Sequence, residues 1–216
     1  MKKILAFLMF LLLAASAMAA GPQGIHEPGT GLNDTDDNAV RPVLYMQKNM
    51  TQIREQINEQ IRERQQEMNG SMAGMNARMK NVYMNQNQVR LAVHALLAME
   101  NLTGGIGRNI SQIARQFNNS VMSTIRAESK IQNRSRIARF FAGGDSDAAD
   151  ELEQDVDQNM LRIQELQKLR QQCNCSEEVR AMIQEQVQNM ELEQNRLRQL
   201  AQAEKQKKGL FGWLWK

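Results

Sequence analysis

Eight Asn-x-Ser/Thr triplets are the part of this sequence whose residue types and spacing specify a chemical modification. None has proline in the middle, and chance placement of the chain's 18 Asn and 14 Ser or Thr would give roughly one triplet. The triplet is the acceptor for an N-linked glycan, which is added only to chains that cross a membrane. An Asn-rich helical chain could also accumulate triplets through caps and turns. The candidate glycosylation sites are Asn33, Asn49, Asn69, Asn101, Asn109, Asn118, Asn133 and Asn174.

The two cysteines of the chain, Cys173 and Cys175, flank a single residue, Asn174. In an exported protein we expect them to be oxidised. Three arrangements stay open: a local disulfide, bridges to a second copy of the chain, and a two-thiolate metal site. A zinc site would need two further ligands, and His26 and His94 have no spacing relation to the cysteines. We therefore expect a disulfide and no metal.

A stripe of methionines could bind copper(I) through its thioethers in an exported protein. Core packing is the better interpretation, because methionine fills irregular seams and no His or Cys lies nearby in the sequence. The stripe consists of Met68, Met72, Met75 and Met79. The chain has no Ser/His/Asp grouping, phosphate-binding loop or HExxH motif. The sequence thus predicts no enzyme activity, no cofactor and no small-molecule substrate.

The N-terminus has the three parts of a secretory signal peptide. Lys2 and Lys3 precede an apolar run over residues 4–15, and small residues at 17 and 19 predict cleavage after Ala19. Residues 1–19 are then removed and the mature protein is secreted or extracytoplasmic. The alternative is an uncleaved N-terminal anchor, because uncharged residues continue to Gly21.

The charge of the mature chain is nearly balanced, at +1 after Lys2 and Lys3 are removed, which gives no reason to expect a nucleic-acid partner. Two segments of the chain each carry a much larger net charge than the whole. Residues 108–141 carry a net charge of +6, and residues 145–172 carry −5. The two segments could pair with each other within the chain. Alternatively, the basic segment could dock on an anionic lipid or polysaccharide.

Composition predicts an all-α protein. The chain is rich in Gln, Glu, Arg, Met and Leu, which are good helix formers. It has only three prolines and 5% aromatic residues. Residues 20–41 contain Gly, Pro, Asn and Asp with little apolar periodicity, and we expect a flexible leader there.

Apolar residues at alternating steps of three and four predict one long coiled-coil helix over residues 42–103. Glycines within residues 69–74 could weaken or break this helix. A continuous but weakened helix is the favoured interpretation. Several glycan acceptors fall at this weak point and at the later helix ends.

Three glycines within residues 104–107 end the long helix. A basic amphipathic helix is predicted over residues 108–141. Two further helices over residues 145–208 are joined by the short cysteine-containing link, which predicts an antiparallel helical hairpin. The expected molecule is therefore elongated, with long coiled-coil helices and a C-terminal hairpin.

The last eight residues, 209–216, form an aromatic tail behind a basic cluster. The tail is far too short to span a bilayer. Aromatic rings flanked by lysines suit the headgroup interface of a membrane. The predicted membrane-interface residues are Leu210, Phe211, Trp213, Leu214 and Trp215. Alternatively, the tail could fold back and plug the open end of the helical bundle.

Together these features predict an exported, N-glycosylated, non-catalytic coiled-coil protein with a structural or interaction role in the cell envelope or at the outer membrane face. Self-association is expected, because narrow apolar seams on long helices bury too little surface without partners. An anionic membrane surface is a second candidate partner. The alternative functions are a membrane-active lipid-binding protein and an exported holdase-type chaperone.

Overall fold

The computed structural model describes residues 37–211, with side chains from Met50 onward. Within this range every regular element is a helix, so the predicted all-α class is confirmed. The α-helices are α1 (Asp37–Ser71), α2 (Ala77–Ala98), α3 (Gly107–Asn133), α4 (Arg136–Ala142), α5 (Ser146–Gln172) and α6 (Glu177–Lys205). Two short 3-10 helices, η2 (Glu100–Leu102) and η3 (Gly104–Ile106), connect α2 to α3.

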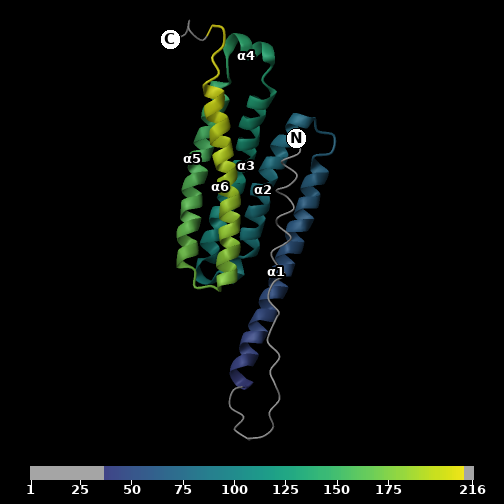
Figure 1. Ribbon diagram of the computed structural model, residues 1–216, viewed down its shortest axis with the longest axis vertical. Helices are drawn as coiled ribbons and strands as arrows, with labels where there is room; N and C mark the ends of the chain where they lie inside the picture. The colour runs from purple at the N-terminus through teal and green to yellow at the C-terminus, as the bar shows by residue number, and fades with distance from the viewer. Residues whose placement is uncertain (1–36, 212–216) are drawn as a thin grey trace, which may run out of the picture. The chain divides into compact units, whose positions relative to one another are not determined.

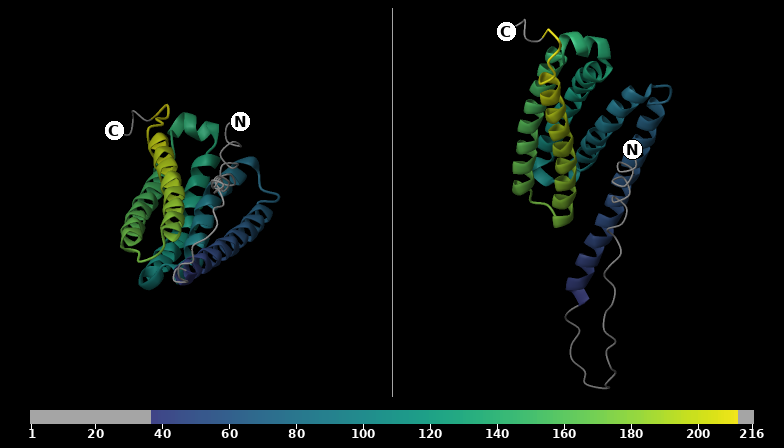
Figure 2. Two further views of the ribbon diagram at one scale, coloured as in Figure 1. Left: turned by 60° about the horizontal axis from the view of Figure 1, so that its bottom comes forward. Right: turned by 45° about the horizontal axis from the view of Figure 1, so that its top comes forward.

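Four helices, α2, α3, α5 and α6, pack into one bundle (Figures 1 and 2). Each of the four contacts two neighbours, in the cyclic order α2, α3, α5, α6. Their apolar stripes meet in a shared core, where Leu96, Phe117, Leu166 and Ile183 are fully buried, one from each helix. Burial of each such side chain stabilises the fold by about 1.5–3 kcal/mol.

The chain breaks between α1 and α2, so the prediction of one continuous helix over residues 42–103 is wrong. Gly74 adopts a φ of 81°, which an L side chain rarely tolerates, and the Asn76 side chain then caps α2 by accepting from the Met79 amide at 3.0 Å. The flexible leader predicted for residues 20–41 is also too long, because α1 already begins at Asp37. Pro42 lies inside the helix, where it removes one backbone hydrogen bond.

The predicted basic helix over residues 108–141 is divided as well. α3 ends at Asn133, and Arg134 leaves the helical conformation with a ψ of 125°. The Ser135 side chain then accepts a hydrogen bond from the Ala138 amide at 3.0 Å and starts α4 as a separate helix. A side-chain cap thus overrides the helical periodicity at this point.

The start of α5 and the end of α6 lie beside each other. Lys205 pairs with Asp150 at 2.5 Å and Arg198 pairs with Asp157 at 2.7 Å. Both helices begin at side-chain caps, since the Asp145 side chain accepts from the Ala148 amide and the Ser176 side chain accepts from the Val179 amide.

A polar network crosses the bundle core between α2, α3 and α6. Arg196 donates to both carboxylate oxygens of Glu128, at 2.9 and 2.7 Å, and to Glu193 at 2.7 Å. Gln86 also donates to Glu193, at 2.9 Å. Burial raises the pKa of the Glu193 carboxyl, against the opposing effect of Arg196. These groups satisfy one another in a place where an unpaired charge would be very unfavourable.

Candidate membrane-interface site

Helix α4 lies at one end of the bundle (Figure 1). It presents large apolar side chains to solvent. Ile137, Phe140 and Phe141 are exposed by 72%, 60% and 44%. Their spacing of three and four residues places them on one face of the helix. This face is short, because α4 has only seven residues. The exposure of its side chains shows that no described helix covers it.

The C-terminal tail joins this apolar face. The Leu210 amide donates to the Phe140 carbonyl at 2.7 Å, and the Phe211 amide donates to the Phe141 carbonyl at 3.3 Å. The rings of Phe141 and Phe211 stack with centroids 5.9 Å apart. We define the end patch as Ile137, Phe140, Phe141, Leu210 and Phe211.

A close backbone crossing holds the tail against the end of α4. A Cβ atom at Gly209 would lie 2.3 Å from the Phe141 carbonyl oxygen and 2.3 Å from the Gly143 amide nitrogen. Both contacts are with backbone atoms, which cannot rotate away. Only glycine therefore fits at position 209 without moving the tail.

Glu204 ties together three segments beneath the end patch. Its buried carboxylate accepts from Arg139 at 2.7 and 2.9 Å, from Lys207 at 2.8 Å and from the Asp145 amide at 3.0 Å. Burial alone would raise the pKa of Glu204, but these hydrogen bonds outweigh burial and lower it. The carboxylate is therefore charged at neutral pH and joins the end of α6 to α4 and to the start of α5.

Positive charge remains around the end patch. Arg136 and Lys208 are exposed, and neither forms an ion pair with another residue in the range 50–211. Only two ion pairs, Lys130 with Glu151 and Arg134 with Asp145, join the basic segment 108–141 to the acidic segment 145–172 within the described chain. Pairing within the molecule thus neutralises only part of the basic segment.

The structure brings together some predicted interface residues and adds others. Leu210 and Phe211 lie in the end patch with exposures of 52% and 44%, so these two do not plug the core. Trp213, Leu214 and Trp215 lie outside the described residues. The α4 residues of the patch were not among the predicted interface residues, because they lie within the predicted basic amphipathic helix over residues 108–141. The cap at Ser135 was the signal that could have separated them.

Six of the predicted glycan acceptors have described side chains, and all six are exposed. Asn69 lies near the end of α1, Asn101 in η2, and Asn174 between α5 and α6. The other three, Asn109, Asn118 and Asn133, lie on α3. Asn33 lies outside the described residues, and Asn49 lies on the part of α1 whose side chains are not described.

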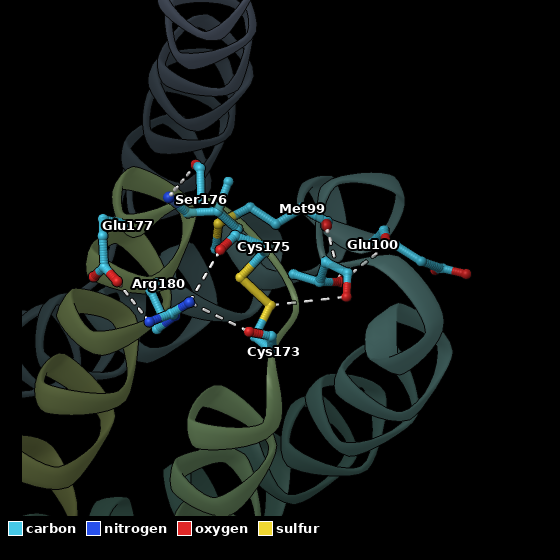
Figure 3. The surroundings of a disulfide bond; sticks show 9 residues. Met99, Glu100, Cys173, Cys175, Ser176, Glu177 and Arg180 are labelled. Atoms are coloured by element: carbon cyan, nitrogen blue, oxygen red, sulfur yellow. Dashed lines mark hydrogen bonds and ion pairs between the residues drawn. A yellow bond between two sulfur atoms is a disulfide. The ribbon is translucent and has the colours of Figure 1, made fainter. Parts of the chain in front are cut away.

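The structure joins Cys173 to Cys175 in a disulfide, with their Cα atoms 5.2 Å apart (Figure 3). Arg180 donates to the Cys173 and Cys175 carbonyl oxygens at 3.5 and 3.1 Å. Figure 3 shows the Arg180 guanidinium held between these carbonyls and Glu177. The link between α5 and α6 is therefore fixed by a covalent bond and by one cation.

Other predicted sites can be placed as well. Met68 and Met72 are buried, which confirms core packing for these two methionines. No group of three or more His, Cys, Asp or Glu side chains in the described part of the chain could hold a metal ion. Among the helices of residues 37–211, none is both long and apolar enough to cross a bilayer.

Comparison with known proteins adds no relative: no protein-family model matches this chain, and neither does any curated protein or solved structure.

Proposed function

We propose that this chain is an exported, N-glycosylated, non-catalytic helical protein that docks on an anionic membrane surface through its end patch. One observation carries the proposal. Nine large apolar side chains are exposed in the described structure, and five of them form the end patch. Scattered exposed apolar residues need no explanation, but a cluster with a basic surround indicates an interaction surface.

The energetics favour a membrane interface. Transfer of each patch side chain out of water contributes on the order of 1.5–3 kcal/mol at full burial. Each Lys or Arg near an anionic surface, such as Arg136 and Lys208, adds about 1 kcal/mol. Trp213 and Trp215 lie two and four residues after Phe211 in the sequence, and tryptophan is enriched at membrane interfaces.

The proposal includes the finer architecture expected from the sequence. We propose that α5 and α6 act as an antiparallel coiled-coil hairpin, which the ion pairs Lys205–Asp150 and Arg198–Asp157 support. The hairpin would serve as the rigid body of an envelope or outer-face protein that self-associates. The end patch would hold that body at the membrane.

Co-sedimentation of the mature protein with liposomes tests the docking. We expect binding to vesicles with anionic lipid and at least about tenfold weaker binding for the double variant Ile137→Ser/Phe140→Ser. The matched control is Leu161→Ser/Leu192→Ser, which removes two equally exposed apolar side chains, 66% and 61% exposed, from the bundle side. Equal loss in both variants would show that general apolar exposure, and not the end patch, drives binding.

Deletion of residues 209–216 gives a second test. We expect the truncated protein to keep its helical circular dichroism and to lose binding to anionic liposomes. The full-length protein should show a blue shift of Trp fluorescence when such liposomes are added, because both tryptophans of the chain lie in the deleted segment. If the fluorescence does not shift, the membrane role is wrong.

A further inference from the structure

Four of the six described glycan acceptor triplets have a hydroxyl group that is engaged in the fold. Because a triplet must have Ser or Thr at its third position, the enzyme that modifies it must recognise that hydroxyl as well as the Asn amide. In four described triplets the hydroxyl donates a hydrogen bond within the protein. Ser71 donates to the Met68 carbonyl, Thr103 to the Glu100 carbonyl, Ser111 to the Glu100 carboxylate, and Ser120 to either the Phe117 carbonyl or Asn159 Oδ1.

Burial adds a second restriction for two of these triplets. Asn101 and Asn109 are themselves exposed, but their partner residues Thr103 and Ser111 are only 1% and 3% exposed. An enzyme bound at either Asn therefore cannot reach the hydroxyl from solvent. Recognition of these triplets requires the chain around η2 and the start of α3 to open.

The backbone gives a third restriction. The triplet of Asn118 lies in the interior of α3, so its amides and carbonyls all belong to the helical hydrogen-bond ladder. The triplet of Asn109 starts in the first turn of α3, where its carbonyls accept within the helix. The triplet of Asn69 forms the end of α1, where the Asn69 and Gly70 carbonyls accept from the Met72 and Ala73 amides at 3.3 and 3.0 Å. The triplet of Asn174 is held differently. Its middle residue, Cys175, is bonded to Cys173, and Arg180 binds the carbonyls of both cysteines.

Asn133 is the exception among the six described acceptors. It is the last residue of α3, and the next two residues, Arg134 and Ser135, have extended ψ angles of 125° and 154°. Ser135 is exposed, and its oxygen only accepts a hydrogen bond, from the Ala138 amide, so its O–H remains free to donate. The Asn133 side-chain amide is exposed and donates to the Met79 sulfur at 3.4 Å, and a thioether is only a weak acceptor. An enzyme can therefore reach the Asn, the hydroxyl and the backbone of this triplet in the folded protein.

We infer that Asn133 is the one described acceptor that can be glycosylated after folding, and that Asn69, Asn101, Asn109, Asn118 and Asn174 are modified only before the bundle forms. The inference rests on the proposed export and glycosylation of the chain. In the transfer, the Asn amide nitrogen bonds to C1 of the sugar, the C1–O bond to a lipid-diphosphate carrier breaks, and the amide releases one proton. The folded structure decides which amides can take part.

Two arms of one experiment test the order. In the first, the full chain is synthesised in the presence of an oligosaccharyltransferase that accepts plain Asn-x-Ser/Thr and its lipid-diphosphate-linked oligosaccharide. In the second, the same enzyme and donor are added to the folded, oxidised, unmodified protein. Glycopeptide mass spectrometry measures the occupancy of each Asn. We expect several modified acceptors in the first arm, and in the second an occupancy of Asn133 at least about tenfold above that of Asn101 and Asn109.

The outcomes separate the inference from the proposed function. Comparable occupancy of Asn133, Asn101 and Asn109 in the second arm would overturn the inference. A second arm in which Asn133 receives no glycan would also overturn it. No transfer to any acceptor in the first arm would instead overturn the proposed glycosylation. The variant Cys173→Ala/Cys175→Ala keeps the triplet of Asn174 and opens the ring, so it should raise the occupancy of Asn174 in the second arm. An unchanged occupancy would show that the ring does not restrict this acceptor.

Discussion

Arg196 is the single side chain on which two buried carboxylates depend. It bonds to Glu128 and Glu193, whose side chains are only 1% and 4% exposed. Without the guanidinium, both carboxylates would remain in the core without a cation. Loss of one partner from a buried ion pair is far more unfavourable than loss of an exposed pair, because the remaining charge cannot be hydrated.

Substitution Arg196→Met is therefore expected to lower the free energy of unfolding by about 3 kcal/mol at pH 7. The matched control is Arg198→Met on the same helix. Arg198 is about as exposed as Arg196, 35% against 34%, but its partner Asp157 is 71% exposed, so the expected loss is below about 1 kcal/mol. Urea unfolding followed by circular dichroism measures both. Similar losses in the two variants would contradict the role assigned to the buried network.

The pKa of Glu204 gives a prediction for pH dependence. Its folded-state pKa lies below the ordinary value of 4.5, so the carboxylate stabilises the fold above that pH and this contribution is lost as the pH falls through the folded-state pKa. We expect Glu204→Gln to lower the free energy of unfolding at pH 7 by about 2 kcal/mol. The difference between variant and parent should shrink in acid. A difference that stays constant from pH 7 to pH 3 would show that the charge of Glu204 is not what stabilises the fold.

At the scale of elements, the junction between α4 and the tail is sensitive to substitution, because Gly209 crosses the backbone of α4 closely. Gly209→Ala would force the tail away from the Phe141 carbonyl, and we expect a loss of about 1–3 kcal/mol in stability together with weaker binding to anionic liposomes. Gly70→Ala is the control, because a Cβ there meets nothing within 4 Å. On helix α1 it should stabilise by about 0.5–1 kcal/mol. Unchanged liposome binding by Gly209→Ala would show that docking does not depend on the position of the tail.

The element boundaries differ in how far sequence alone could predict them. α5 and α6 lie within the predicted range 145–208, because their caps at Asp145 and Ser176 are local interactions of residue types that favour helix starts. The break before α2 depends on the choice between a weakened helix and a turn at Gly74, and the apolar periodicity on either side is compatible with both. Periodicity also cannot tell which apolar face finds a partner. Phe117 and Phe140 continue one helical pattern, yet the first is fully buried and the second is 60% exposed.

At the scale of the whole bundle, the end patch and the α5–α6 link lie at opposite ends (Figure 1). Only Arg134 and Ser135 separate Asn133 from α4, whereas Asn174 lies in the α5–α6 link. A bulky polar glycan at Asn133 should therefore hinder membrane docking, and one at Asn174 should not. For the natively glycosylated protein, we expect Asn133→Gln to strengthen liposome binding roughly fivefold and Asn174→Gln to leave it unchanged. Both variants should match the parent when all three proteins are made without glycans.

The bridge between Cys173 and Cys175 spans a sequence separation of only 2. A cross-link stabilises a fold mainly by reducing the chain entropy of the unfolded state, and that effect grows with the length of the loop it closes. Here almost no loop is closed, so the bundle owes little of its thermodynamic stability to oxidation. Its thermal midpoint should barely change in reducing buffer, and the helices can assemble in either redox environment. The bridge acts on local geometry, because it fixes where the chain reverses direction between α5 and α6.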